Sequence, residues 1–270
     1  MIEWMNMISV LTTTFNRAHT LRRLFDSLVA QDNARFEWVV VDDGSSDGTE
    51  ELLGNFAQDG RISLRVVKQS NAGKHLAINV GVEAASGNWI FIVDSDDMLT
   101  PDAISKVYDG IDRARDSLLL GICFRRGDFE GGVIGVKVMA EKSEFSYMHS
   151  TEAGCFYQGD LAYIFKKQAL LDHPFPAFEE ENFVPELLIW NEIADVGKIA
   201  YFHRDIIYLC EYLADGYTRN FSVNLRRNPK GFGAFYRQQF FRETTAIGRL
   251  KKAVRYLQCI YYAKKRTWGK

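Results

Sequence analysis

The sequence has few cysteines and no long apolar run, and each shortage excludes a class of protein. The four cysteines in 270 residues are far apart and form no C-x-x-C pair, which argues against a disulfide framework and against a zinc site. The longest apolar stretches, Ile90–Val93 and Leu118–Phe124, are much shorter than the roughly 18–20 residues that cross a bilayer. We therefore expect reduced, buried thiols and no membrane-spanning helix.

Two further absences concern the first residues and the nucleotide-binding motifs. Met1–Phe15 carries Glu3 and lacks both a basic start and a small-residue cleavage site, so it does not match a secretory signal, and we expect a cytoplasmic protein. Neither a Walker loop nor a G-x-G-x-x-G spacing occurs, which argues against a P-loop and a dinucleotide fingerprint. The 47% of hydrophobic residues can fill a large core, which excludes global disorder.

Charge divides the chain into two regions. Residues 217–270 hold 14 Lys and Arg and the single acid Glu243, whereas residues 1–216 hold 19 Lys and Arg and 34 Asp and Glu. This asymmetry predicts a body that meets cations and a tail that meets an anionic partner. Nucleic acid is not the expected partner, because the body is acidic and contains no recognised nucleic-acid motif.

Strand-like and helix-like segments alternate through the first hundred residues. Short β-branched or apolar runs predict four strands, and segments with apolar residues at helical spacing follow each of them. This alternation predicts an α/β fold with a mostly parallel sheet and helices on both faces. Glycine-separated runs from Leu118 to about Glu144 indicate antiparallel strands or a hairpin, and the chain after Phe165 is expected to be helical. The four predicted strands are 8–12, 37–41, 64–67 and 89–93.

Polar clusters follow three of these strands, and the most acidic is Asp94-Ser95-Asp96-Asp97. Carboxylates this close repel one another unless a cation or a set of hydrogen-bond donors offsets the cost. Hard oxygen ligands favour Mg²⁺ or Mn²⁺, and magnesium is usually held by one or two carboxylates together with water and substrate phosphates. The cluster therefore indicates a nucleoside-diphosphate site, although a solvated turn before a helix has the same composition.

Two other turns carry complementary chemistry. Asp42-Asp43-Gly44-Ser45 follows the second strand and offers carboxylates to ribose hydroxyls or a base N–H, as an acidic strand end does in dinucleotide folds. Asn71–His75 opens a helix, where free N–H groups attract anions and Lys74 adds a positive charge. Since ligands of open α/β sheets bind at the carboxyl ends of the strands, we expect these turns to converge.

Taken in order, these motifs resemble the family 2 glycosyltransferases with the GT-A fold. The resemblance implies a catalytic domain over residues 1–216, with a nucleotide-binding half (1–100) and an acceptor-side half (101–216), followed by a basic aromatic extension (217–270). The later parts look like bacterial enzymes that build capsule, exopolysaccharide or lipopolysaccharide. The motifs are T-T-F-N-R at 13–17, V-V-V-D-D-G-S-S-D at 39–47, N-x-G-K at 71–74, N-x-G at 79–81 and D-S-D-D at 94–97.

The resemblance also implies roles for single residues around a nucleotide-sugar donor, with a UDP-sugar favoured. The donor would contact residues from each motif, and a divalent metal, Mn²⁺ or Mg²⁺, would be held by Asp94 and Asp96. Phe15 stands where the family more often has Tyr, so it keeps a stacking face without a hydroxyl. The expected donor-binding residues are Thr14, Phe15, Arg17, Asp42, Asp43, Lys74, Asp94 and Ser95.

An inverting transferase also needs a carboxylate to deprotonate the acceptor hydroxyl. The segment F-E-E-E-N-F-V-P-E at 178–186 is similar to the family's E-D segment, and Pro185-Glu186 aligns with it. This alignment puts Glu186 at the base position, with Glu181 as the alternative. These acids could instead simply favour the amino end of a helix that begins near Pro185.

The leading hypothesis is thus a metal-dependent inverting glycosyltransferase of cell-surface polysaccharide synthesis. Its acceptor would be a saccharide or a lipid-linked saccharide. Residues 249–270 form an amphipathic basic segment that could lie on the anionic inner face of the membrane or pack on the catalytic domain. The competing hypotheses are a sugar nucleotidyltransferase and a non-catalytic nucleotide-sugar-binding subunit.

Overall fold

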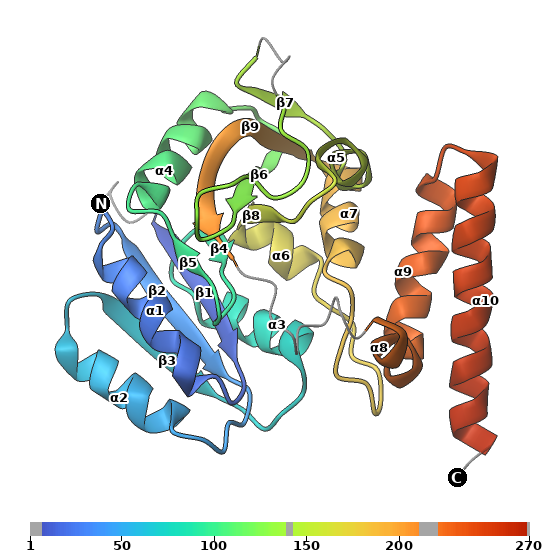
Figure 1. The fold of residues 1–270 in the computed structure, drawn as a ribbon, viewed down its shortest axis with the longest axis horizontal. Helices are drawn as coiled ribbons and strands as arrows, with labels where there is room; N and C mark the ends of the chain where they lie inside the picture. Colours follow the sequence, from blue (N-terminus) through green and yellow to red (C-terminus); the bar gives the residue numbers. More distant parts are fainter. Residues whose placement is uncertain (1–6, 139–142, 211–220, 269–270) are drawn as a thin grey trace.

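The computed structural model describes residues 7–138, 143–210 and 221–268 of the protein (Figure 1). The predicted boundary between residues 216 and 217 lies outside the described residues. Nine strands of the described chain form one sheet. They are β1 (Ile8–Thr14), β2 (Phe36–Asp42), β3 (Ser63–Lys68), β4 (Trp89–Ile92), β5 (Met98–Leu99), β6 (Leu119–Gly127), β7 (Phe145–Tyr147), β8 (Leu161–Lys166) and β9 (Lys198–Leu209).

The sheet combines a parallel half with a mixed half. Its order is β3-β2-β1-β4-β8-β6-β9-β5, with β7 paired to β9. Strands β3, β2, β1 and β4 are parallel, as predicted for the first hundred residues. Beyond them β8 is antiparallel to both β4 and β6, whereas β6 is parallel to β9. The mostly parallel prediction therefore holds for the nucleotide-binding half, and the sheet as a whole is mixed.

Helices cover both faces of the sheet, as the alternating pattern predicts (Figure 1). Residues of α1, α2 and α4 pack with one set of strand side chains, and residues of α3, α5, α6 and α7 pack with the other set. The helices are α1 (Ala18–Val29), α2 (Thr49–Asp59), α3 (Lys74–Ala84), α4 (Ala103–Arg113), α5 (Ser150–Tyr157), α6 (Lys167–Asp172) and α7 (Leu187–Val196).

Strand β2 shows how the sequence forms both cores. Trp38 and Val40 point to one core, and Val39 and Val41 to the other, because side chains of a strand alternate between the two faces. All seven residues of β2 are buried. A central strand with both faces covered requires such a continuous apolar run, and this is the feature by which the sequence predicts it.

The carboxyl-terminal region forms a separate helical unit at one end of the molecule (Figure 1). It consists of α8 (Phe221–Arg227), α9 (Pro229–Arg242) and α10 (Ala246–Trp268). Leu225, Phe232, Tyr236 and Cys259 form its own small core. None of the described helices is both long enough and apolar enough to span a membrane.

Two strands of the second half are missing from the sequence-based expectation. Helices α6 and α7 follow Phe165 as expected, but β9 is a strand of 12 residues in the segment expected to be helical, and β8 lies in a segment for which no strand is predicted. Strand β9 contains His203, Arg204 and Asp205 in its middle, which interrupts the apolar pattern that identifies a strand. These two strands complete the sheet next to the predicted site.

Candidate active site

The carboxyl ends of β2, β1 and β4 lie side by side, because these three strands are parallel neighbours. Thr14 is in register with Asp42, and the backbone N–H of Asp43 donates to the carbonyl oxygen of Thr14 over 2.9 Å. The turns after β2, before α3 and after β4 also contact one another, as described below. The structure thus brings together at one edge the three polar turns that the sequence analysis singled out.

Thr14 and Asp42 form a buried polar pair at this edge. Both are less than 5% exposed. Among the residues that the structure describes, the Thr14 hydroxyl has no hydrogen-bond partner, and one carboxylate oxygen of Asp42 accepts from the backbone N–H of Ser45 over 2.9 Å. A buried hydroxyl without a partner is costly. A ligand with polar edges, such as a nucleotide base or ribose, can supply the missing bond.

Asp43 has a different role from its neighbour. One of its carboxylate oxygens accepts from the backbone N–H of Ala72 over 2.8 Å, and the other from that of Gly73 over 2.9 Å. The side chain of Gln69 donates to the same carboxylate over 2.6 Å. Asp43 therefore fixes the turn that precedes α3. Of the two aspartates considered for the donor, Asp42 is the one whose carboxylate is not committed to holding a neighbouring turn.

Lys74 is the first residue of α3 and connects two carboxylates. Its Nζ lies 2.5 Å from Oδ1 of Asp94 and 2.6 Å from Oε1 of Glu186. Burial by itself would lower the pKa of Lys74, but the two carboxylates outweigh it and raise that pKa above its ordinary value. A lysine with a positive charge thus stands between the predicted donor-binding aspartate and the predicted base.

Asp94 faces a second cation, Arg126 of strand β6. The Arg126 guanidinium lies 3.6 Å from Oδ2 of Asp94 and 3.8 Å from Oδ2 of Asp97. Burial raises the pKa of Asp94, but Lys74 and then Arg126 lower it more, to about 2. The Tyr208 hydroxyl donates to Asp97 over 2.6 Å and accepts from the backbone N–H of Asp94 over 2.9 Å. Residues of β6 and β9 thus hold this turn in place.

Burial acts in the opposite direction on Asp97. Together with the adjacent charge of Asp94, it raises the pKa of Asp97 to about 7. Tyr208 and Arg126 partly offset this effect. Asp97 is 4% exposed, so its side chain stabilises the turn from inside and does not face solvent.

Asp96 and Ser95 complete the acidic turn. Asp96 is partly exposed, and its side chain makes no ion pair with any residue that the structure describes. Its backbone carbonyl accepts a hydrogen bond from the Arg23 guanidinium of α1, which fixes the backbone at this point. Ser95 is 6% exposed. Of the three aspartates in the motif, Asp96 is therefore the one whose carboxylate is not paired with a described Lys or Arg.

The loop after β1 presents Phe15 to solvent. Phe15 is 47% exposed, so its ring is available for stacking. Asn16 beside it has a φ of 54°, and its backbone N–H donates to the Ser45 hydroxyl over 2.9 Å. Arg17 precedes α1, and its carbonyl oxygen accepts from the backbone N–H of Thr20. The β1–α1 loop is thus tied to the β2–α2 turn.

The two candidate bases lie in different surroundings. Glu186 stands at the amino end of α7 with 29% of its side chain exposed, next to Lys74. Glu181 is 5% exposed, and its two carboxylate oxygens accept from the backbone N–H groups of Lys230 and Gly231, each over 2.8 Å. Glu181 thus caps the amino end of α9. Both carboxylate oxygens of Glu181, the alternative base, are thus used to bind backbone N–H groups at the start of a helix.

The acidic turn has the donor set for a hard divalent cation. Asp96 offers a partly exposed carboxylate, whereas the two oxygens of Asp94, two residues earlier, face Lys74 and Arg126. Over the described ranges, no three His, Cys, Asp or Glu side chains are grouped as a metal site. The residues therefore fit an ion that takes one or two protein carboxylates and completes its shell with substrate phosphates.

Arg126 and Tyr208 are site residues that the sequence analysis missed. Arg126 is one of two adjacent arginines in an otherwise apolar strand, and its guanidinium lies 3.9 Å from the centre of the Tyr208 ring. A charged residue inside an apolar strand is expensive unless it is paired. This signal is readable in the sequence, but its partner lies on β9, a strand that the sequence pattern did not reveal.

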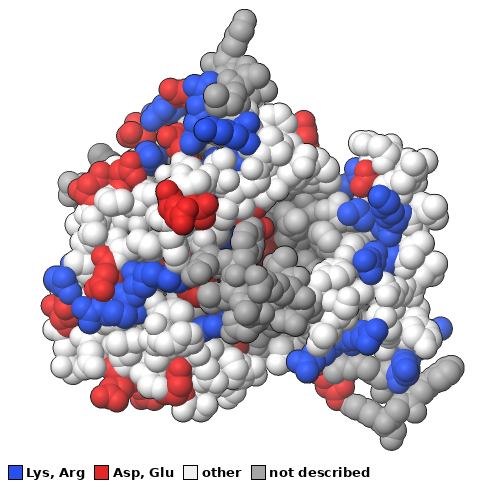
Figure 2. Space-filling view, in the orientation of Figure 1, with Lys and Arg blue, Asp and Glu red and all other residues white. Residues whose placement is uncertain are grey.

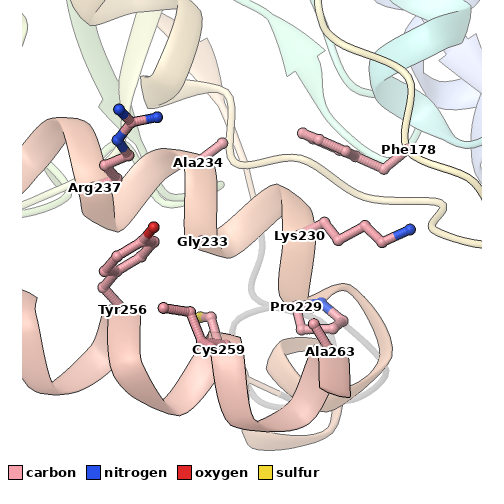
Figure 3. A pocket seen from close by; sticks show the side chains of 10 residues that line it. Phe178, Pro229, Lys230, Gly233, Ala234, Arg237, Tyr256, Cys259 and Ala263 are labelled. Carbon is pink, nitrogen blue, oxygen red and sulfur yellow. The ribbon is translucent and has the colours of Figure 1, made fainter. Parts of the chain in front are cut away.

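A cavity in the carboxyl-terminal unit lies away from this cluster. It has a volume of about 290 Å³ and is formed between α9, α10 and Phe178 (Figure 3). Lys230 and Arg237 border it, and the rest of its lining is largely apolar. It belongs to the carboxyl-terminal unit and contains none of the predicted donor-binding residues.

Comparison with known proteins identifies the family. The profile described as "Glycosyl transferase family 2" matches residues 9–172, which span the strands and turns of the site. This chain belongs to glycosyl transferase family 2. The matched range includes the three polar turns and Arg126, whereas Glu186 and Tyr208 lie beyond it.

Individual relatives extend the similarity into the second half of the protein. A Campylobacter jejuni protein, "GalNAc(5)-diNAcBac-PP-undecaprenol beta-1,3-glucosyltransferase", is 28% identical over 233 residues, covering 84% of this chain and 72% of that protein. Matches to several other bacterial relatives cover only 18% to 54% of those proteins' own length.

Solved structures confirm the GT-A fold. TarS from S. aureus, in complex with UDP-GlcNAc, superposes with a TM-score of 0.70 at 19% identity, covering 95% of this chain and 72% of that chain. The mannosyltransferase PcManGT from Pyrobaculum calidifontis, in complex with GDP-Man and Mn²⁺, gives a TM-score of 0.65 at 18% identity, covering 98% and 76%. At these identities the likeness establishes the fold.

Proposed function

We propose that this protein is a metal-dependent, inverting glycosyltransferase that moves a sugar from a nucleoside-diphosphate donor, with a UDP-sugar favoured, to an acceptor hydroxyl. The observation that carries the proposal is the contact of Lys74 with both Asp94 and Glu186. The Lys74 ammonium group lies between Asp94, which is predicted to bind the nucleotide-sugar donor, and Glu186, which is predicted to be the base. The relatives named for UDP-GlcNAc and GDP-Man support a nucleotide sugar as the donor.

The donor's parts match the turns of the site. Phe15 would stack on the base, and Asp42 with the Thr14 hydroxyl would bind base or ribose. Lys74, at the amino end of α3, would face the diphosphate, because helix N–H groups and a lysine both attract anions. Arg17 and Ser95 border the same edge as further donor contacts. Asp43 would act indirectly, by holding the turn that carries Lys74.

The chemical step needs one base. The acceptor hydroxyl gives its proton to a carboxylate oxygen of Glu186, and its oxygen forms the new bond to the anomeric carbon. The bond from that carbon to the diphosphate breaks, and the nucleoside diphosphate leaves with the electron pair. A single displacement of this kind inverts the anomeric centre. A Mg²⁺ or Mn²⁺ ion held by Asp96 and Asp94 would stabilise charge on the departing diphosphate.

The acceptor is proposed to be a saccharide or a lipid-linked saccharide in the synthesis of a cell-surface polysaccharide. The name of the Campylobacter jejuni relative, a transferase acting on an undecaprenol-linked saccharide, supports this class. The protein would then work in the cytoplasm, at the inner face of the membrane. Family membership favours sugar transfer over the two competing functions, a sugar nucleotidyltransferase and a non-catalytic binding subunit. Release of pyrophosphate from a nucleoside triphosphate would indicate a nucleotidyltransferase.

Substitution of the base tests the chemistry. Glu186→Gln keeps the size of the side chain but removes its basicity, so transfer should fall by about 10²–10⁴-fold while donor binding persists. The measurement is the rate of nucleotide release with and without acceptor, together with donor affinity by calorimetry. Glu181→Gln is the comparison: it should lower the melting temperature through the α9 cap and reduce turnover per folded molecule far less than Glu186→Gln does. Turnover of Glu186→Gln at the normal rate would refute the assignment.

Substitution of Asp96 tests the metal. We expect Mn²⁺ to increase the thermal stabilisation that a donor gives the wild type, because a ligand that binds the folded state stabilises it. In Asp96→Asn this metal-dependent increment should disappear and transfer should fall by about 10-fold or more. Asp26→Asn, which changes an exposed carboxylate on α1, should keep the increment. A scan of UDP-, GDP- and dTDP-sugars in the same assay identifies the base. An Asp96→Asn increment equal to that of the wild type would remove the metal from this turn.

A further inference from the structure

Helix α10 carries a row of large apolar side chains that no described residue covers. The row members are 56% to 70% exposed and follow one another at intervals of three and four residues, so they lie on one face of the helix. We call this set the outer row. It consists of Ile247, Leu250, Val254, Leu257 and Tyr261.

The opposite face of α10 is already occupied. Tyr256, Cys259, Ile260 and Ala263 border the cavity against α9 (Figure 3), and Cys259 is only 1% exposed. A helix that packs on one neighbour needs one apolar face, with polar residues on the other. Helix α10 has two apolar faces, and α9 accounts for one of them. The outer row therefore indicates a second partner.

The charge beside the outer row is of one sign. Lys251, Arg255, Lys264 and Lys265 are exposed on the same helix, and residues 246–268 contain no Asp or Glu. Figure 2 shows Lys and Arg side chains spread over α9 and α10 on the visible face, with few acidic ones among them. An apolar row bordered by basic residues complements a surface that is apolar inside and anionic at its edge.

We propose that the outer row of α10 docks on an anionic lipid bilayer, with the helix lying along the surface. The outer row would enter the boundary between headgroups and acyl chains, and the basic residues would meet lipid phosphates. A second copy of this chain is a poorer fit, because pairing two such helices would bring basic residues together with no acid to offset them. The inference deepens the proposed function, since it names the surface on which a lipid-linked acceptor would be met.

The test is sedimentation of the full-length protein with vesicles of phosphatidylcholine alone or mixed with phosphatidylglycerol. We expect the wild type to bind the anionic vesicles and to be released at high salt. Leu250→Glu/Leu257→Glu should lower the bound-to-free ratio by about tenfold or more, because it removes apolar contact and adds repulsion. The matched control is Leu118→Glu/Val196→Glu, which changes two residues of similar exposure outside the carboxyl-terminal unit and should bind as the wild type does.

Two companion measurements separate the possible outcomes. Leu250 and Leu257 are 65% and 62% exposed, so the double variant should keep the wild-type melting temperature and its transfer to a soluble acceptor. Glu186→Gln should lose transfer and keep vesicle binding, so a failure of docking and a failure of the proposed chemistry are distinguishable. Equal vesicle binding by the wild type and the outer-row variant would overturn the proposal. So would a wild-type dimer in light scattering that the outer-row variant makes monomeric, since the row would then pair two copies.

Discussion

Two buried threonines of strand β1 differ in whether the protein satisfies them. The Thr12 hydroxyl accepts from the indole N–H of Trp38 over 3.0 Å, whereas no described residue bonds the Thr14 hydroxyl. Thr12 therefore contributes to folding. Thr14 keeps a hydroxyl without a hydrogen-bond partner at the edge of the sheet where the nucleotide-sugar donor would bind.

Thr14→Val should separate binding from stability. Valine keeps the shape and removes a hydroxyl that is unsatisfied without a ligand, so the melting temperature should stay equal or rise. The KM for the donor should rise by roughly 2–10-fold, the equivalent of one hydrogen bond, with kcat little changed. Thr12→Val is the control and should do the reverse, because it strands the Trp38 N–H in the interior. A donor KM unaffected by Thr14→Val would show that this hydroxyl does not contact the donor.

The sequence predicts that the polar turns converge at one edge of the sheet, but it does not show which residue of each turn is free to meet a ligand. Asp42 and Asp43 are adjacent and chemically identical, and only the position of Gly73 shows that Asp43 is used to hold a turn. Glu181 and Glu186 differ in the same way, since Glu181 caps a helix that begins 48 residues later. Residue type and spacing predict which chemistry is present. Which atom has a protein partner depends on contacts that are distant in sequence.

At the scale of elements, the same limit explains the missed strands. Strands β1, β2 and β4 are predictable from sequence because each contains a short β-branched or apolar run, and these runs are buried on both faces of the sheet. Strand β9 lies in the mixed half and carries polar residues, among them His203, whose ring bonds the hydroxyls of Tyr157 and Ser146. A buried polar network of this kind interrupts the apolar pattern in the sequence. The strand is nevertheless buried, because the hydrogen bonds within the network satisfy its polar groups.

One ion pair joins the catalytic domain to the carboxyl-terminal unit. Asp195, in the last turn of α7, accepts from the guanidinium of Arg242 in the last turn of α9, and His149 lies 3.1 Å from the same carboxylate. Burial raises the pKa of Asp195, but the hydrogen bonds from Arg242 and His149 outweigh it, so the pKa lies below its ordinary value. A carboxyl group with a lowered pKa stabilises the folded state when it is ionised.

Asp195→Asn should therefore destabilise the protein in a pH-dependent way. The folded pKa is below the unfolded one, so the contribution is present at neutral pH and is lost as the pH falls below the ordinary value of 3.8. Asp195 is 46% exposed, and solvent screening limits the effect to about 1 kcal/mol or less. The difference in melting temperature between wild type and variant should shrink as the pH is lowered from about 6 to about 3. Asp112→Asn, which breaks an exposed pair within one short segment, should show no such trend. A difference that grows toward acid pH would contradict the assignment.

At the scale of the whole molecule, the candidate active site is a contact between the two halves of the predicted catalytic domain. Lys74 and Asp94 come from the first hundred residues, whereas Glu186, Arg126 and Tyr208 come from the second half. The carboxyl-terminal unit supports this contact from outside. Its helix α9 is capped by Glu181, and Asn228 accepts from the backbone N–H of Asn182, so the loop that leads to Glu186 is held by α9.

Gly73 is a point of close approach between the two halves. Its φ is 92°, and a Cβ atom there would lie 2.1 Å from the carbonyl oxygen of Asn182. Gly73→Ala must therefore push the 181–186 loop away from α3, at a cost of about 1–3 kcal/mol in the free energy of unfolding. Since Lys74 follows directly, its contact with Glu186 should open as well, and transfer should fall by about tenfold or more.

Gly48→Ala provides the control for this substitution. Gly48 precedes α2 with a φ of −71°, and a Cβ atom there would have no neighbour within 4 Å. Chemical denaturation and initial transfer rates of the two variants then compare the same change at a crowded and an open position. If Gly73→Ala lost stability and kept full transfer, the loop could move without disturbing the base. If both variants behaved as the wild type does, the close approach of the two halves would not be needed for either folding or catalysis.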